Sequence, residues 1–218
     1  QDIRYYLNGL LLITKGNELR VVTTDGHRLA YATGSLSDTP SPIEVILPRK
    51  TVLELSRQLV DSEDLVEIIF TPSQARFKFN NIEFISKLID GKFPDYERVI
   101  PQHHGKIIKL SRNQLIQALQ RVAILMNEKF RGVRLLLDSG SLKIISNNTE
   151  QEEAQEEIEI DYTGEPLDVG FNVTYLLDIL NNVSEEVIEL HLADANSSAL
   201  FILPGNQNFK YVVMPMRI

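Results

Sequence analysis

The order of secondary-structure signals along this chain repeats, and the repeat strongly constrains the fold. Each copy reads as a short apolar strand, an amphipathic helix, and three further strands separated by turn residues. Complete copies begin near Ile43, Lys106 and Leu167. The period is too long for the common solenoid repeats and is typical of duplicated domains that combine helices with sheets. The sequence therefore predicts an α+β fold, with helices on one face of antiparallel sheets.

One helix is expected in each copy, and each has a recognisable start. Pro48 suits a first helical turn, and Ser111 and Asn172 suit N-caps. The first two helices are expected over residues 48–60 and 111–126. Apolar residues at helical spacing mark the buried faces: Val52, Leu53, Leu55 and Leu59 in the first helix, Leu115, Leu119, Val122 and Met126 in the second, and Leu176, Ile179 and Leu180 in the third.

The expected strands group the copies into two domains. In the complete copies they lie near residues 45–47, 65–70, 75–79 and 82–87, then 133–137, 142–146 and 156–160, then 187–192, 199–203 and 210–213. Earlier strands near residues 10–14, 19–24 and 27–33 have no long helix before them. Two copies make a domain of about 100 residues. We therefore expect a first domain at residues 1–99 that lacks its first strand and helix, and a complete domain at residues 100–218.

Composition excludes several classes of protein. Of the 218 residues, 43% are hydrophobic and 24% are charged, which is typical of a globular chain. There is no cysteine, which excludes disulfides, thiolate catalysis and cysteine-bound metals. No run approaches the roughly 18 apolar residues of a membrane span, and the first residues show no signal-peptide pattern. A cytoplasmic protein is expected.

The charge pattern separates the helices from the rest of the chain. Lysine and arginine number 22 against 30 acidic residues, a net charge of −8, which argues against binding nucleic acid by bulk charge. The first two helices nevertheless carry five bases, Arg49, Lys50, Arg57, Arg112 and Arg121, against one acid, Glu54. The third helix has Asp178 and no base. The acidic run at residues 150–161 is expected to be a solvated loop and strand face.

Motifs for catalysis are missing from the sequence. It contains no G-x-S-x-G, G-x-x-x-x-G-K-[ST], G-x-G-x-x-G or H-E-x-x-H pattern, so we expect no catalytic residue, metal or cofactor. Asp25-Gly26 lies between two apolar runs and predicts a hairpin turn. His103-His104 falls in the expected linker, where an adjacent pair cannot by itself complete a metal site.

Two short stretches leave alternatives open. The chain ends on "FKYVVMPMRI", in which Pro215 breaks a strand and leaves Met214 and Met216 beyond the sheet. These residues are either a tail folded back into the core or one wall of an exposed apolar pocket. In "RYYLNG", Tyr5 and Tyr6 follow a base and either stack on nucleic acid or belong to a core or hairpin.

Several runs together resemble the bacterial sliding clamp family, the beta subunit of DNA polymerase III. They are "RYYLNG", "TDGHRLA", "PRK", "SKLIDGKFPDY", "NEKFRGVRL", "QEEA", "GFNVTYLLD" and "YVVMPMR", and they cover the chain from end to end in order. Members of this family have three similar domains. The resemblance implies that this chain corresponds to the second domain, without its first strand and helix, and to the whole third domain.

The resemblance also implies a function and its residues. Family members are non-catalytic processivity factors, head-to-tail ring dimers that encircle double-stranded DNA with helices lining the hole. The residues implied to face DNA are Gln1, Tyr5, Tyr6, Arg49, Lys50, Arg57, Arg112 and Arg121. Ile124 and Leu125 match a hydrophobic contact with the first domain of the neighbouring subunit. Without that domain, we expect this chain to be a monomer in dilute solution.

The resemblance further implies an apolar pocket that binds short linear motifs of DNA polymerase subunits, the clamp loader and repair polymerases. Methionines suit a site with many partners because a flexible thioether repacks around different side chains. The implied pocket residues are Leu7, Thr24, Gly26, His27, Arg28, Leu29, Pro94, Arg98, Val99, Asn172, Tyr175, Ser198, Val212, Val213, Met214, Pro215, Met216 and Arg217. The acidic charge keeps a competing hypothesis open, a peptide-binding scaffold that does not act on DNA. An enzyme is a more distant alternative.

Overall fold

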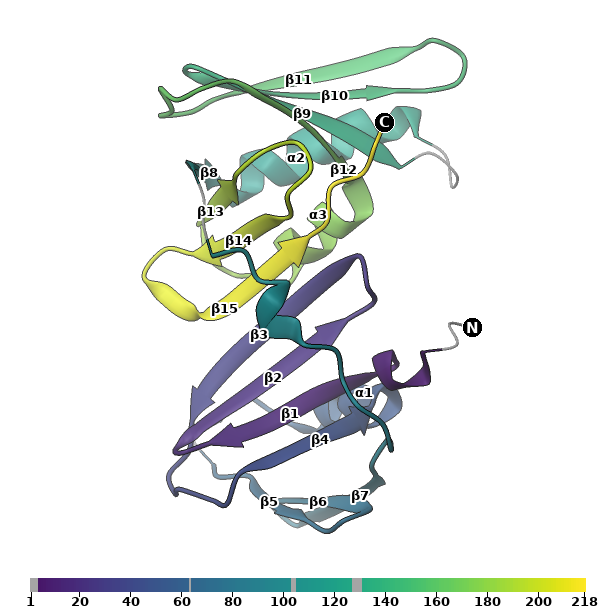
Figure 1. Ribbon diagram of the computed structural model, residues 1–218, viewed down its shortest axis with the longest axis vertical. Coiled ribbons are helices and arrows are strands. Elements are labelled where there is room, and N and C mark those ends of the chain that lie inside the picture. Colours follow the sequence, from purple (N-terminus) through teal and green to yellow (C-terminus); the bar gives the residue numbers. More distant parts are fainter. Residues whose placement is uncertain (1–3, 63, 103–104, 127–130) are drawn as a thin grey trace. The chain divides into compact units, whose positions relative to one another are not determined.

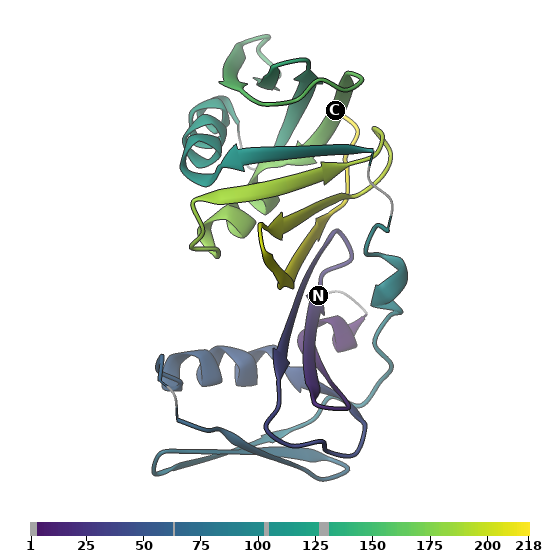
Figure 2. The ribbon, with the colours of Figure 1, turned by 90° about the vertical axis from the view of Figure 1, so that its left-hand side faces the viewer.

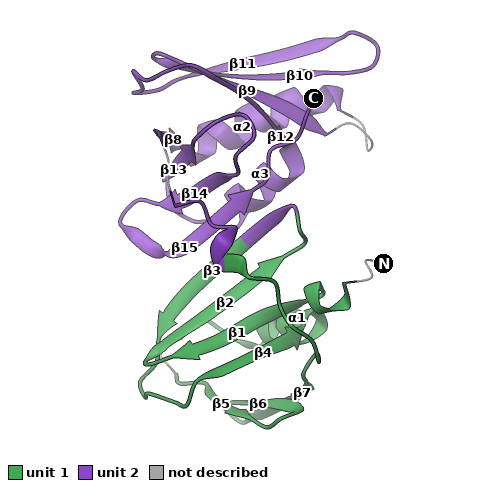
Figure 3. Cartoon of the chain, in the orientation of Figure 1, with its two compact units in different colours: residues 1–26, 30–96 green, residues 27–29, 97–218 purple. Residues whose placement is uncertain are grey.

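The computed structural model describes residues 4–62, 64–102, 105–126 and 131–218 (Figure 1). The chain divides into two compact units (Figure 3). Unit 1 comprises residues 1–26 and 30–96, and unit 2 comprises residues 27–29 and 97–218. Each unit is built from the strand, helix and strand order that the sequence predicts.

In the described residues of unit 1, one helix lies between two antiparallel sheets (Figure 2). The first sheet has the order β4-β1-β2-β3, and the second has the order β5-β6-β7. The elements of this unit are η1 (Tyr5–Leu7), β1 (Gly9–Lys15), β2 (Glu18–Thr24), β3 (Arg28–Ser35), β4 (Ile43–Pro48), α1 (Arg49–Gln58), β5 (Glu67–Phe70), β6 (Gln74–Phe79) and β7 (Ile82–Lys87). The first two residues of β3, Arg28 and Leu29, belong to unit 2. A short turn, η2 (Tyr96–Arg98), follows. Asp25-Gly26 lies in the β2–β3 connection, as predicted, and Gly26 has the positive φ of 89° that favours glycine.

Helix α1 buries a narrower face than the sequence predicts. Leu55 packs in the core with Leu12, Leu47 and the inward residues of β6, as expected. Leu53 and Leu59 were expected in the same apolar stripe, but they are 46% and 41% exposed. Leu53 lies two residues from Leu55, about 200° around the helix, and Leu59 follows the last helical residue. The inward position one turn before Leu55 is filled by a threonine, whose hydroxyl lies 2.5 Å from the buried Ser86 hydroxyl.

Where the structure describes unit 2, two helices lie between two antiparallel sheets (Figure 1). One sheet has the order β11-β10-β9-β12, and the other has the order β15-β14-β13-β8. Its elements are β8 (Lys106–Ser111), α2 (Arg112–Val122), η3 (Ala123–Leu125), β9 (Gly132–Asp138), β10 (Ser141–Asn147), β11 (Glu153–Glu159), β12 (Leu167–Asn172), α3 (Val173–Asn181), β13 (Val187–Leu192), β14 (Ala199–Leu203) and β15 (Asn206–Val213). The first strand of each copy pairs with the other copy, β8 with β13 and β12 with β9.

The core of unit 2 confirms the predicted helix faces. Leu115, Leu119 and Val122 of α2 are buried, and so are Leu176, Ile179 and Leu180 of α3. Met126 lies beyond α2, because the helix ends at Val122 and a 3-10 turn follows. Both predicted caps are present. The Ser111 hydroxyl accepts from the Gln114 amide at 3.5 Å, and the Asn172 side chain accepts from the Thr174 amide at 2.9 Å.

The predicted strands all have counterparts, and the acidic run behaves as predicted. It forms β11 at the edge of its sheet, where Glu153, Gln155, Glu157 and Glu159 alternate outward. Alternation of this kind is typical of a strand with one solvated face. Over the part of the chain that the structure describes, no helix is both long and apolar enough to cross a membrane.

Candidate functional site

The C-terminal tail, residues 214–218, lies on the surface of unit 2. Strand β15 ends in the fully buried Val212 and Val213. Beyond it, the Met214 amide donates to the His27 carbonyl oxygen at 2.9 Å. The Met216 amide donates to the Gly170 carbonyl oxygen, also at 2.9 Å. Two backbone hydrogen bonds therefore hold the tail in an extended path, one on each side of Pro215.

Two glycines form the floor under this tail. A Cβ atom added at Gly170 would lie 2.5 Å from the Met216 carbonyl oxygen and 2.7 Å from Cδ1 of Ile218. One added at Gly132 would lie 3.0 Å from Ile218. Glycine is required here because the tail runs against the strand backbone. Met214 and Met216 remain 41% and 39% exposed, so the tail is not folded into the core.

A second part of the expected pocket lies on helix α3. The guanidinium carbon of Arg28 is 4.4 Å from the centroid of the Tyr175 ring, which is a cation–π stacking distance. The Arg28 Nη1 atom also donates to the Asp178 carboxylate. Arg28 directly follows His27, whose carbonyl oxygen accepts the first of the two hydrogen bonds that hold the tail.

The remaining expected pocket residues fall in both units. In unit 2, Leu29 is buried, Val99 and Ser198 are half-buried, Asn172 caps α3, and Arg98 and Arg217 are exposed. In unit 1, Leu7 ends η1 and Pro94 is exposed. Also there, the Thr24 hydroxyl accepts from the Gly26 amide at 3.1 Å. Unit 2 alone thus brings together the tail, His27, Arg28 and Tyr175.

Sequence reasoning missed three residues of this cluster, namely Asp178, Gly132 and Gly170. Asp178 was seen only as a charge on α3. The two glycines lie within strands, where glycine weakens a strand and often marks the close approach of another backbone. A glycine within an expected strand could therefore have indicated that another backbone segment lies against both positions.

The bases expected to face DNA have different surroundings. Arg49 and Lys50 are exposed in the first turn of α1, and Arg57 lies 3.6 Å from Glu54 one turn away. Tyr5 is 61% exposed and meets Tyr6 edge-on with ring centroids 5.8 Å apart. Gln1 lies outside the described residues.

Helix α2 holds its two candidate bases through polar contacts. The Arg112 Nε atom donates to the Leu180 carbonyl oxygen at 2.6 Å. Arg121 makes a bidentate ion pair with Glu156 of β11, at 2.7 and 2.8 Å. The hydrogen bonds of this pair raise the pKa of Arg121 and lower the pKa of Glu156. Arg121 is thus partly neutralised by its own unit.

The expected dimer contact is an exposed apolar turn. Ile124 lies in η3 and is 78% exposed, while its neighbour Leu125 is half-buried. Covering an apolar side chain as exposed as Ile124 with another surface is favourable, because it removes apolar area from water.

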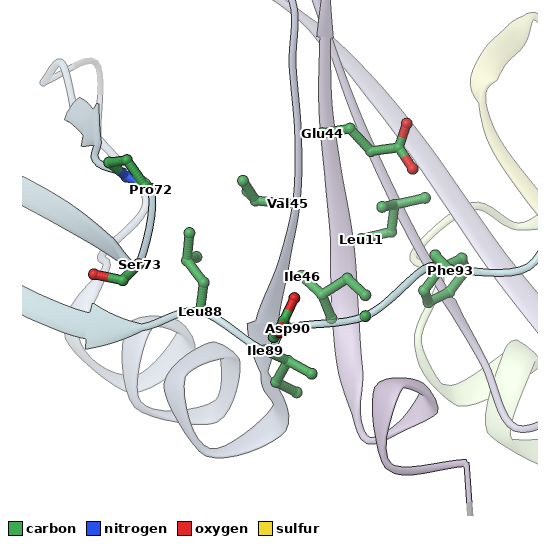
Figure 4. Close-up of a pocket in the computed structure, with 11 residues that line it drawn as sticks. Leu11, Glu44, Val45, Ile46, Pro72, Ser73, Leu88, Ile89, Asp90 and Phe93 are labelled. Carbon is green, nitrogen blue, oxygen red and sulfur yellow. The ribbon is translucent and has the colours of Figure 1, made fainter.

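Unit 1 also contains a pocket that sequence reasoning did not predict (Figure 4). It has a volume of about 450 Å³ and is lined by Leu11, Glu44, Val45, Ile46, Pro72, Ser73, Leu88, Ile89, Asp90, Gly91 and Phe93. None of the expected site residues lines it. Across the described ranges, no group of three or more histidine or acidic side chains could hold a metal ion.

Comparisons with known proteins agree with the architecture of both units. The family described as "DNA polymerase III beta subunit, C-terminal domain" matches residues 97–217, and the central-domain family of the same subunit matches residues 1–95. The beta sliding clamp of Pseudomonas putida is 52% identical over 224 residues, which cover 100% of this chain and 60% of that protein. The beta sliding clamp of Escherichia coli is 45% identical over 218 residues, with the same coverage.

Solved structures show the same relationship. The crystal structure of the DNA polymerase III subunit beta from Pseudomonas aeruginosa matches with a TM-score of 0.96 at 49% identity, covering 100% of this chain and 60% of that one. The Caulobacter crescentus beta sliding clamp matches with a TM-score of 0.94 at 39% identity, covering 100% of this chain and 59% of that one. The chain therefore spans about 60% of the length of its relatives. By sequence and by fold, it belongs to the family of the bacterial DNA polymerase III beta subunit.

Proposed function

We propose that this chain is part of a DNA sliding clamp, a non-catalytic processivity factor of a bacterial replicative DNA polymerase. Its membership of the beta-subunit family, along its whole length, carries this proposal. Residues 1–99 would be the central domain without its first strand and helix, and residues 100–218 the C-terminal domain. The protein would act in the cytoplasm, where replication takes place in bacteria.

In the full-length protein, two subunits would close a ring around double-stranded DNA. Arg49 and Lys50 of α1 support a DNA-facing role for this helix, and Arg112 of α2 would lie on the same DNA-facing side. Cations near a helix N-terminus oppose the helix dipole, so helix stability does not explain them. Encirclement would replace tight binding, which is compatible with a net charge of −8. Ile124 and Leu125 would contact the neighbouring subunit.

The tail and the Arg28–Tyr175 pair would bind short linear motifs of DNA polymerase subunits, the clamp loader and repair polymerases. Support comes from the tail's anchoring on both sides of Pro215, with its methionines left partly exposed. An extended, fixed backbone with exposed thioethers offers apolar contact to a peptide without the ordering of a mobile segment.

Calorimetric titration with a short clamp-binding peptide from a DNA polymerase tests the docking role. The chain and a version without residues 214–218 would be titrated in parallel, with the fold of each checked by circular dichroism. We expect the truncated chain to retain its fold and lose binding. Equal binding by both would show that the tail is not part of the site.

The competing function is a peptide-binding scaffold that does not act on DNA, which the acidic charge favours. Loading of the full-length protein onto closed circular DNA separates the two. A clamp should stay on closed circles and slide off after the circle is cut, whereas a scaffold should stay on neither.

A further inference from the structure

Asp178 is the one charged residue of α3, whose sequence is VTYLLDILN. It lies three residues after Tyr175, and residues at this spacing are neighbours on one helix face. Its carboxylate accepts from Arg28, and the same guanidinium stacks on the Tyr175 ring. The helix therefore holds one arginine from two positions, by charge and by stacking.

This contact is too exposed to be explained by stability. The side chains of Arg28 and Asp178 are 33% and 48% exposed, and ion pairs at the surface contribute little to folding. Arginine is a long side chain with many rotamers, and fixing it before a ligand arrives removes an entropic cost from binding. The planar guanidinium also suits simultaneous stacking and carboxylate pairing, which lysine does not offer.

The position of the contact ties it to the tail. Arg28 directly follows His27, whose carbonyl oxygen accepts from the Met214 amide. Helix α3 begins directly after β12, the strand whose Gly170 anchors Met216. Movement of Arg28 would therefore disturb the same surface on which the tail is held.

We propose that Asp178 is a positioning residue of the peptide site, which holds Arg28 flat on Tyr175 and partly neutralises its charge. An arriving apolar peptide then meets a preformed wall instead of a mobile cation. This inference rests on the proposed peptide-docking function. It assigns to Asp178 an indirect role, through Arg28, and no direct contact with the peptide.

The first test compares two asparagine variants by calorimetric titration with the polymerase-derived peptide. D178N removes the charge that holds Arg28. D168N is the matched control, because Asp168 makes an ion pair of the same kind with Arg134 elsewhere in unit 2. We expect D178N to weaken binding by about three- to tenfold, toward the lower end of the coupling between contacting side chains, and D168N to leave it unchanged. Unchanged binding in D178N would overturn the proposal.

A double-mutant cycle with R28A then separates positioning from a general structural role. If Asp178 acts through Arg28, D178N should cause no further loss in the R28A background. An equal loss in both backgrounds would overturn the proposal. D178E, which keeps the charge, should restore at least part of the affinity that D178N loses.

The order of Arg28 in the free protein gives a readout that does not depend on peptide. The Nε–Hε resonance of Arg28 should be resolved and should report a rigid side chain in the original chain and in D168N. In D178N it should report a mobile side chain. An Arg28 that stays rigid in D178N would refute the positioning role. Failure of the proposed docking function would be distinct, because the unmutated chain itself would then not bind the peptide.

Discussion

Gly170 is the residue on which the path of the tail depends most directly. Any side chain there must displace both the Met216 carbonyl oxygen and the Ile218 side chain. We expect G170A to cost about 1–3 kcal/mol of stability through overpacking, and to weaken peptide binding by about tenfold, the loss of about 1.4 kcal/mol. Gly34→Ala is the control, because a Cβ at Gly34 meets nothing within 4 Å. Peptide titration and urea unfolding of both variants check this, and full affinity in G170A would contradict the floor role.

Tyr211 links stability to alkaline pH. Burial, and then the nearby Glu185 charge, raise the pKa of this phenol in β15. The folded chain therefore holds the proton at a pH where the unfolded chain releases it. Stability from this group is present below the unfolded pKa of about 10 and is lost as pH rises through the folded pKa. We expect urea unfolding to show this loss, and Y211F to reduce it.

Tyr5, which is 61% exposed, supplies the comparison for that experiment. Y5F should leave the alkaline loss of stability as it is in the original chain. If Y211F and Y5F behave alike, other groups control the alkaline transition.

Local sequence predicts single residues when a neighbour along the chain decides their role. Ser111 and Asn172 cap helices because the amides they accept from are two or three residues away. The Arg28–Asp178 contact could not be predicted, because it joins residues 150 positions apart. Leu53 was wrongly expected on the buried face of α1, because its apolar character was given more weight than its angular position on the helix.

Among the elements, α1 and α2 begin with bases and have no acid in the first turn. R49Q/K50Q removes both positive charges and should not destabilise the fold. Loss of their unfavourable interaction with the positive end of the helix dipole should stabilise the chain by about 0.3–1 kcal/mol per charge. If both bases contact phosphates, the salt dependence of duplex DNA binding should fall by about two units of log–log slope. Fluorescence anisotropy of labelled duplex DNA at several salt concentrations measures this slope.

Lys87→Gln is the matched control for that experiment, because Lys87 is an exposed base on strand β7 and not on a helix. An equal change of slope per charge removed in the two variants would indicate general attraction to DNA and not a helical DNA-facing surface. A marked loss of stability in R49Q/K50Q would show that the bases serve the fold.

Element order was predictable from sequence, but pairing between elements was not. Alternation and turn residues are local signals, and they indicate each strand of unit 2. That β8 pairs with β13 and β12 with β9 depends on contacts between distant segments, which no local pattern encodes. The pocket residues likewise came from family resemblance, because residues from several segments must converge before they form a site.

For the whole molecule, we expect a monomer in dilute solution. The chain spans about 60% of the length of its relatives, and Ile124 is exposed in the place where a neighbouring subunit is proposed to bind. Sedimentation velocity should give one species of 24.8 kDa, and I124A should sediment in the same way. A stable dimer that I124A dissociates would show that these 218 residues pair through Ile124.

The crosswise pairing of unit 2 also means that its two halves are interlocked. The first strand of each half pairs in a sheet whose other strands come from the other half. Neither half therefore contains a complete pair of sheets alone. A protease cut in the connection at residues 160–166 would break the chain but would not separate the pieces. The fragments should stay associated until denaturant is added, and neither should fold when it is made without its counterpart.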